Sequence, residues 1–177
     1  MRINKILLLM VTSFFLVACS GENVSSNKNV GNENKGGQTL KFIVAPQYEG
    51  KESNLIELGK KLTKEHPDLG NQGSLSINYT GATFSSNQQE YAVFLLINKA
   101  GFQIDKDFEF SLSWKYDGQF IYQHQRIGYK ISDSGVLPDQ SATILTLPIS
   151  SEQKQIVETM TQEEKMSLEM SDLKVKK

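Results

Sequence analysis

The feature that most constrains this chain is a period-two alternation of apolar and polar residues, which begins near Gly73 and continues to about Ile149. Its clearest stretch, residues 108–114, reads Phe-Glu-Phe-Ser-Leu-Ser-Trp. Successive side chains of a strand point to opposite faces, so this pattern predicts strands with one buried face. Turn-forming residues separate the runs about every 8–12 residues, and no helical segments alternate with them. The sequence therefore predicts a mainly β fold of about seven or eight short antiparallel strands.

Three further segments refine this prediction. The run Tyr91–Ile97 is apolar without alternation, so it predicts a central strand that is covered on both faces. Asp117-Gly118 is a hairpin turn signal. Residues 53–66 change to a helical period and predict a short N-terminal amphipathic helix. We expect residues 39–149 to form one antiparallel immunoglobulin-like β-sandwich.

The C-terminal segment, residues 150–177, is rich in Glu, Lys, Gln and Met. Ser150 and Gln153 stand at the spacing of a capping box, so the segment predicts a C-terminal helix or tail. On such a helix Met166 and Met170 share one broad apolar face. Two interpretations remain open. The segment is either a solvated helix or a docking helix for a partner, to which methionine is suited because it repacks easily.

The N-terminus has the pattern of a targeting signal. Arg2 and Lys5 precede the apolar run Ile6–Val17, which is shorter than the ~20 residues of a membrane-spanning helix but typical of a signal peptide. The run ends in Leu-Val-Ala-Cys at Cys19, which resembles the bacterial lipobox. That resemblance implies a signal peptide over residues 1–18 and a diacylglycerol and palmitate anchor on Cys19. The alternative is an ordinary secretory signal in which Cys19 is incidental.

Cys19 is the single cysteine of the chain, which excludes disulfides and thiolate metal sites. Residues 19–38 are mostly polar and too poor in apolar residues to fold, so we expect an acylated cysteine followed by a disordered tether. Two or three acyl chains hold a protein stably on a bilayer. We therefore expect a lipoprotein on the extracytoplasmic face of the bacterial cell membrane, with the lipid bilayer as its first partner.

Charge and motifs argue against several other functions. The chain has 19 Lys and Arg against 20 Asp and Glu, which does not favour binding to nucleic acid. His66 and His124 are its two histidines, and neither lies in a spacing that would join two metal ligands. Residues 105–109 carry alternating acids but lack the glycine turn and terminal glutamate of an EF-hand loop. We predict no catalytic residues, no metal and no cofactor.

Three tyrosines are the predicted surface contacts within the sandwich. Tyr116, Tyr122 and Tyr129 lie next to predicted turns, and a tyrosine side chain carries a polar end that suits an interface. Together with Met166 and Met170 of the C-terminal segment, they are the residues that we expect to contact a protein partner.

The strand pattern between His66 and Glu152 resembles the SLAP domain, a small β module of Firmicute surface proteins that is linked to S-layer and accessory Sec export systems. The segments that carry the resemblance are His-Pro-Asp-Leu-Gly at 66–70, Leu-Ser-Ile-Asn-Tyr at 75–79, Val-Phe-Leu-Leu-Ile-Asn at 93–98, Phe-Glu-Phe-Ser-Leu at 108–112, Asp-Gly at 117–118 and Gly-Val-Leu-Pro at 135–138. The resemblance implies a non-enzymatic function in the cell envelope.

These observations lead to one functional expectation and one alternative. We expect a membrane-anchored binding or assembly module for envelope or exported proteins. Because a fold does not fix a function, the alternative is a small envelope hydrolase or a proteinase inhibitor on the same fold.

Overall fold

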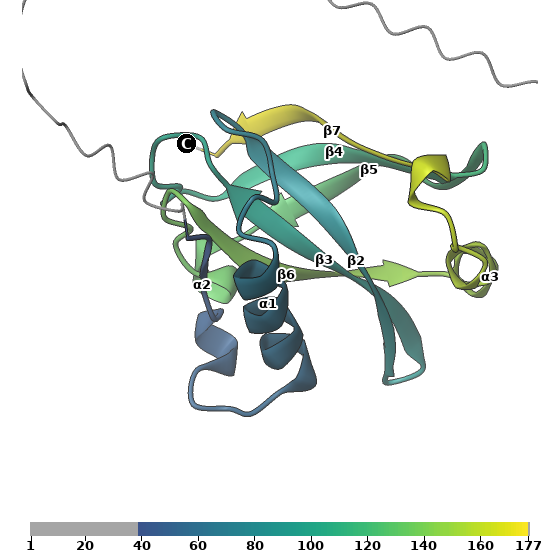
Figure 1. Ribbon diagram of the computed structural model, residues 1–177, viewed down its shortest axis with the longest axis horizontal. Coiled ribbons are helices and arrows are strands. Elements are labelled where there is room, and N and C mark those ends of the chain that lie inside the picture. Colours follow the sequence, from purple (N-terminus) through teal and green to yellow (C-terminus); the bar gives the residue numbers. More distant parts are fainter. Residues whose placement is uncertain (1–38, 177) are drawn as a thin grey trace, which may run out of the picture. The chain divides into compact units, whose positions relative to one another are not determined.

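The structure is a computed structural model that describes residues 39–176, and in this range it contains two β-sheets and three α-helices (Figure 1). The predicted signal peptide, the acylation site at Cys19 and the tether lie outside the described residues. The strands are β1 (Lys41–Phe42), β2 (Leu75–Ser86), β3 (Gln89–Asn98), β4 (Phe108–Tyr116), β5 (Gln119–Tyr129), β6 (Ser141–Ile149) and β7 (Met166–Val175). The helices are α1 (Asn54–Glu65), α2 (Ile131–Ser134) and α3 (Ser151–Glu158), with 3-10 turns η1 (Pro46–Tyr48) and η2 (Glu163–Lys165).

The first sheet has the strand order β1-β6-β3-β2, and the second has the order β5-β4-β7. Neighbouring strands are antiparallel, apart from β1 and β6, which are parallel. The predicted mainly β, antiparallel architecture is therefore confirmed. The order differs from the ABED and CFG sheets of an immunoglobulin constant domain. Strands β2 and β7 each end a sheet, and this position shapes the candidate site.

Aromatic side chains fill the space between the two sheets. Phe94 of β3 and Phe110 and Trp114 of β4 are fully buried there. The ring centroid of Trp114 lies 5.1 Å from that of Phe94 in an edge-on arrangement and 5.7 Å from that of Tyr122. Each buried side chain of this size contributes about 1.5–3 kcal/mol of transfer free energy. The aromatic and aliphatic residues of the segment 108–114 occupy alternate positions, so they all point inward, as the alternation predicts.

Helix α1 covers the other face of the first sheet. The Ser53 hydroxyl caps its start by accepting a backbone hydrogen bond of 3.3 Å. Leu62 of the helix packs against the cluster that contains Leu95 and Ile97 of β3. The residues between and beside them in β3, Phe94 and Leu96, face the second sheet. Strand β3 is therefore buried on both faces, because it has apolar layers on both sides, and the prediction of a central strand is confirmed.

Two buried polar residues at the end of β3 hold the nearby loops in place. The side-chain amide of Asn98 donates three hydrogen bonds of 2.8, 2.9 and 3.1 Å to carbonyls of the loops that follow β3 and precede β6. The Lys99 ammonium group donates to the carbonyls of Pro67 and Asp68, each at 3.2 Å. The Lys99 bonds fix the loop that runs from α1 into β2, which forms one wall of the candidate site.

A bulge interrupts β2 on its way to the hairpin with β3. Residues 80–82 stand opposite a single residue of β3, Val93. Gly81 has φ = 78°, a left-handed conformation that glycine adopts without steric cost. The Thr80 hydroxyl donates to the Val93 carbonyl at 2.8 Å. Because a bulge disrupts the ladder and bends the strand, the regular part of the β2 edge ends at Tyr79.

The C-terminal segment corrects two predictions. The capping box at Ser150 and Gln153 is present, but α3 ends at Glu158, and the prediction that 150–177 is helical is wrong beyond that residue. Residues 166–175 form β7, which pairs with β4 and completes the second sheet. The predicted end of the sandwich at residue 149 is wrong for the same reason. Met166, Leu168 and Met170 alternate with polar residues, so the segment has the period of a strand.

Candidate functional site

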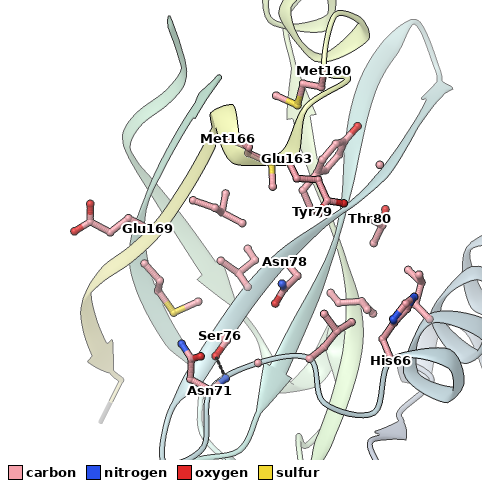
Figure 2. A pocket seen from close by; sticks show the side chains of 18 of the residues that line it. His66, Asn71, Ser76, Asn78, Tyr79, Thr80, Met160, Glu163, Met166 and Glu169 are labelled. Carbon is pink, nitrogen blue, oxygen red and sulfur yellow. Dashed lines mark hydrogen bonds between the residues drawn. The ribbon is translucent and has the colours of Figure 1, made fainter. Parts of the chain in front are cut away.

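An open groove lies between the edge strands β2 and β7 and has a volume of about 940 Å³ (Figure 2). These strands end their respective sheets, and they approach each other on the same side of the sandwich. This volume is near the upper end of the range for ligand pockets, ~300–1,000 Å³. We call this cavity the β2–β7 groove.

The part of the groove that lies between the sheets is apolar. Its lining side chains are Leu75, Ile77, Tyr79, Met160, Met166, Leu168 and Met170, with Tyr116 at one end. The β7 members point inward because they share one parity of an edge strand, and they are half-buried instead of fully covered. Methionine is flexible and polarisable, so this wall can adapt to differently shaped apolar groups.

The groove also reaches around β2 to the side of α1. There it is lined by Leu62, His66 and Leu69, together with the outward-facing polar residues Ser76 and Asn78 of β2. Figure 2 shows β2 crossing the middle of the site, with β7 on one side and His66 on the other. The free edge of β2 therefore runs along the floor of the groove, which has open space on each side of the strand.

Two glutamates line the groove but point in different directions. The Glu163 side chain of η2 points into the groove toward the part of β2 that carries Tyr79 and Thr80, whereas the Glu169 side chain of β7 points away (Figure 2). Both side chains are exposed. The Glu163 carboxylate forms no hydrogen bond or ion pair with any other residue in the described range 39–176, although the backbone carbonyl of Glu163 accepts a hydrogen bond from the Met166 N–H. The carboxylate is therefore available to a cationic group that lies along β2.

Burial controls the ionisation of the tyrosine at the centre of the groove. Desolvation raises the pKa of Tyr79 from its ordinary value of 10.0 to about 12, so burial disfavours the charged form of its hydroxyl still further. The Tyr79 ring packs 4.8 Å from Trp114 and 5.5 Å from Phe94, measured between ring centroids. The indole nitrogen of Trp114 is buried and has no hydrogen-bond partner among residues 39–176. This wall is thus aromatic and uncharged.

A second cavity of about 590 Å³ continues from the groove and shares Leu75 and Met170 with it. Three large apolar side chains stand out into solvent around this cavity. They are Phe102, which is 64% exposed, Leu173, which is 51% exposed, and Val175, which is 58% exposed. Exposed apolar side chains that gather in one place are typical of an interaction surface.

The structure contradicts the premise on which three predicted contact residues rest. Tyr116, Tyr122 and Tyr129 are 7%, 5% and 1% exposed, so the prediction that they lie on the surface is wrong. Each hydroxyl is used within the fold. Tyr122 donates to a β6 carbonyl at 2.8 Å, Tyr129 donates to the Gly135 carbonyl at 2.9 Å, and Tyr116 accepts from the backbone after α3 at 3.1 Å. Tyrosines next to turns can point inward when a carbonyl lies within reach.

The structure brings Met166 and Met170 together in one wall of the groove. Their strand conformation, instead of a helix, is what places them on a common face with Leu168. Sequence reasoning missed Met160, Glu163 and the β2 residues of the groove. The alternation of Leu75, Ile77 and Tyr79 was visible in the sequence, but it does not reveal that β2 is an edge strand.

The alternative of a hydrolase depends on whether His124 meets a serine and a carboxylate. The Ser113 hydroxyl oxygen lies 3.4 Å from His124 Nδ1 and also accepts the His124 backbone N–H at 3.4 Å. His124 is exposed on the outer face of the second sheet, and neither residue lines either of the two cavities. An activated serine nucleophile requires a third group, such as a carboxylate, that orients the histidine ring. Within the described residues, no carboxylate binds the ring of His124.

Residues 39–176 contain no group of three or more His, Cys, Asp or Glu side chains placed to hold a metal ion. In the same range, no helix has the length and apolar character needed to cross a membrane.

Comparisons with protein-family models, with curated proteins and with solved structures found no match to this chain.

Proposed function

We propose that the chain is a lipid-anchored extracytoplasmic lipoprotein whose β-sandwich acts as a non-enzymatic binding or assembly module for envelope or exported proteins. The observation that carries this proposal is the β2–β7 groove, an open cavity of about 940 Å³ that lies along the free edge of a strand. The predicted anchor on Cys19 supports the proposed location. The predicted resemblance to SLAP domains supports a role in the envelope.

The shape of the site favours a macromolecular partner. Its cavity is open and continues into a second one, and exposed Phe102, Leu173 and Val175 extend the apolar surface beyond it. A small ligand is usually enclosed over most of its surface, whereas a protein partner covers an extended area. Immunoglobulin-like sandwiches present strand edges and loops in this way, and we propose the same use of the scaffold here.

The location can be tested on the anchor itself. Mass analysis of the membrane form should show acyl chains on Cys19, and Cys19→Ala should release the protein or leave its signal peptide uncleaved. A mature protein that begins elsewhere and carries no lipid would refute the proposed attachment.

The binding role is tested by site-specific crosslinking on intact cells. A photoreactive phenylalanine replaces Gln162, which is exposed and lines the groove, or Gln125, which is exposed on β5 and does not line it. We expect Gln162 to capture a defined envelope or exported protein and Gln125 to capture none of it. Equal capture of the same proteins from both positions would contradict a specific site in the groove.

A further inference from the structure

We propose that the β2–β7 groove receives an extended segment of another polypeptide, which adds as a strand to the free edge of β2 and places a Lys or Arg side chain beside Glu163. This inference rests on the proposed function, because it names the chemistry of the partner and its mode of binding at the same site. It is a case of recognition by strand addition, in which main-chain hydrogen bonds provide affinity and alternate side-chain pockets provide specificity.

The backbone of β2 has hydrogen-bonding groups available along its outer edge. The Lys99 N–H donates to the Ser74 carbonyl at 3.0 Å. This bond shows which residues of β2 direct their backbone groups toward β3, because Ser74 directly precedes the strand and directs its carbonyl there. Because hydrogen-bonded and non-hydrogen-bonded positions alternate in antiparallel pairs, Ser76 and Asn78 direct their backbone groups toward β3. Leu75, Ile77 and Tyr79 then direct theirs toward the groove, where the described residues include no further strand.

The groove offers room on both faces of an added strand. Every residue from Leu75 to Gly81 lines it, so the cavity surrounds the β2 edge, whereas β7 contributes its inward-facing wall. Alternate side chains of an added strand would point between the sheets toward Met166 and Met170. The others would point toward Leu62 and Leu69 on the α1 side. Space on both sides of one strand edge matches the period of two of an extended chain.

The bulge limits the length of the added strand. Regular pairing is available from Leu75 to Tyr79, and residues 80–82 interrupt the ladder. Five residues at about 3.4 Å each span roughly 17 Å, which suits a segment of five to seven residues. Proteins usually protect an edge of this kind with charges or a covering loop, and here the regular part of β2 carries no charged residue.

Charge at the end of this edge indicates the side chain that the partner carries. Glu163 points into the groove toward Tyr79 and Thr80, where the regular edge stops, and its carboxylate has no ion-pair partner among the described residues (Figure 2). Tyr79 is neutral, so the local charge is negative. A Lys or Arg at one end of the bound segment would pair with Glu163, and the apolar side chains of the segment would fill the groove.

The test uses the full mature chain and a phage-displayed library of random heptapeptides as the probe. We expect enrichment of peptides with apolar residues at alternate positions and a Lys or Arg near one end. The inference would be overturned if the enriched peptides lacked alternating apolar residues. It would also be overturned if the chain enriched no peptides beyond those that an unrelated lipoprotein selects from the same library.

Amide hydrogen exchange then locates an enriched synthetic peptide on the protein. In the free protein, the amides of Leu75, Ile77 and Tyr79 should exchange at least about tenfold faster than those of Ser76 and Asn78, and the peptide should slow that first set. Protection at β7 without β2 would overturn the proposed mode of binding. Concentration-dependent protection of the same amides without peptide would show that a second copy of this chain occupies the edge, and would overturn the choice of partner.

A matched pair of charge reversals tests the role of Glu163. Glu163→Lys should weaken the enriched peptide about fivefold, as expected for an exposed ion pair of ~1 kcal/mol. Glu164→Lys has the same net charge and is equally exposed, but Glu164 does not line the groove, so it should leave the affinity unchanged. Equal effects of the two variants would refute the contact. If no peptide binds but Gln162 still captures a partner on cells, the inference fails and the proposed function stands.

Discussion

Gly59→Ala should destabilise this protein, although a glycine-to-alanine change inside an ordinary helix stabilises that helix by about 1 kcal/mol. Gly59 is a buried residue of α1 that lies against the ring of Phe42 in β1. A Cβ atom added at Gly59 would overlap that ring, because the three nearest atoms all belong to Phe42 and lie within 2.9 Å. The Phe42 ring fills the space next to Gly59, so a side chain at this position has no room unless the ring moves.

The magnitude follows from two opposing effects. Forcing an extra carbon into a packed site costs about 1–3 kcal/mol, and the better helix propensity of alanine offsets about 1 kcal/mol of this. We expect a net loss of about 1 kcal/mol in the free energy of unfolding, which lowers the melting temperature by roughly 2–4 °C.

Urea unfolding measures this effect through the fluorescence of Trp114, the single tryptophan of the chain, which is fully buried. Phe42→Leu provides the control, because it shortens the side chain that would collide. In that background Gly59→Ala should no longer destabilise and should recover up to about 1 kcal/mol of helix propensity. An increase in the free energy of unfolding for Gly59→Ala in the natural background would refute the packing argument.

Two further predictions concern buried and paired charges. Lys99→Met keeps the apolar stem but removes the two hydrogen bonds to loop carbonyls. It should therefore lower the free energy of unfolding, measured with urea, by about 2 kcal/mol. The control is Lys106→Met at an exposed position, which should cause no measurable loss. An equal loss in both variants would contradict this. Hydrogen bonds, chiefly from Lys154, hold the pKa of Glu90 below its ordinary value of 4.5. The pair therefore contributes its full stability above pH 4.5. This contribution is lost as the pH falls through the lower pKa that Glu90 has in the folded protein. Urea midpoints between pH 7 and 3 should therefore fall less steeply for Glu90→Gln, and an unchanged slope would refute the role of the pair.

Local patterns were sufficient to predict much of the fold. The parity of residues 108–114 determines which side chains of β4 are buried, because neighbouring strand residues must point to opposite faces. Asp117 and Gly118 form the predicted turn, with φ values of 48° and 80° that suit a two-residue hairpin. These features are encoded within a few residues of each other, so they can be recognised without knowing what they pack against.

The C-terminal segment shows where local pattern fails. Met166 and Met170 are four residues apart, a spacing that places side chains on one face in a helix and in a strand alike. The intervening Leu168 favours the strand, but its effect is weaker than that of the helix-forming Glu, Lys and Gln around it. Pairing with β4, more than fifty residues earlier in the chain, decides the outcome. A partner strand so far away in the chain cannot be recognised from the residues of the segment itself.

By itself, the sequence determined the mainly β class and the aromatic core, which follow from period-two alternation, and the central position of β3, which follows from a run that is apolar on both faces. It also predicts the anchor at Cys19. The tertiary structure alone decided that Tyr116, Tyr122 and Tyr129 are buried and that β2 and β7 are the edges that form the groove. The physical reason is that periodicity tells which face of a strand is apolar. Only the order of strands in the sheets tells which backbone edges remain free.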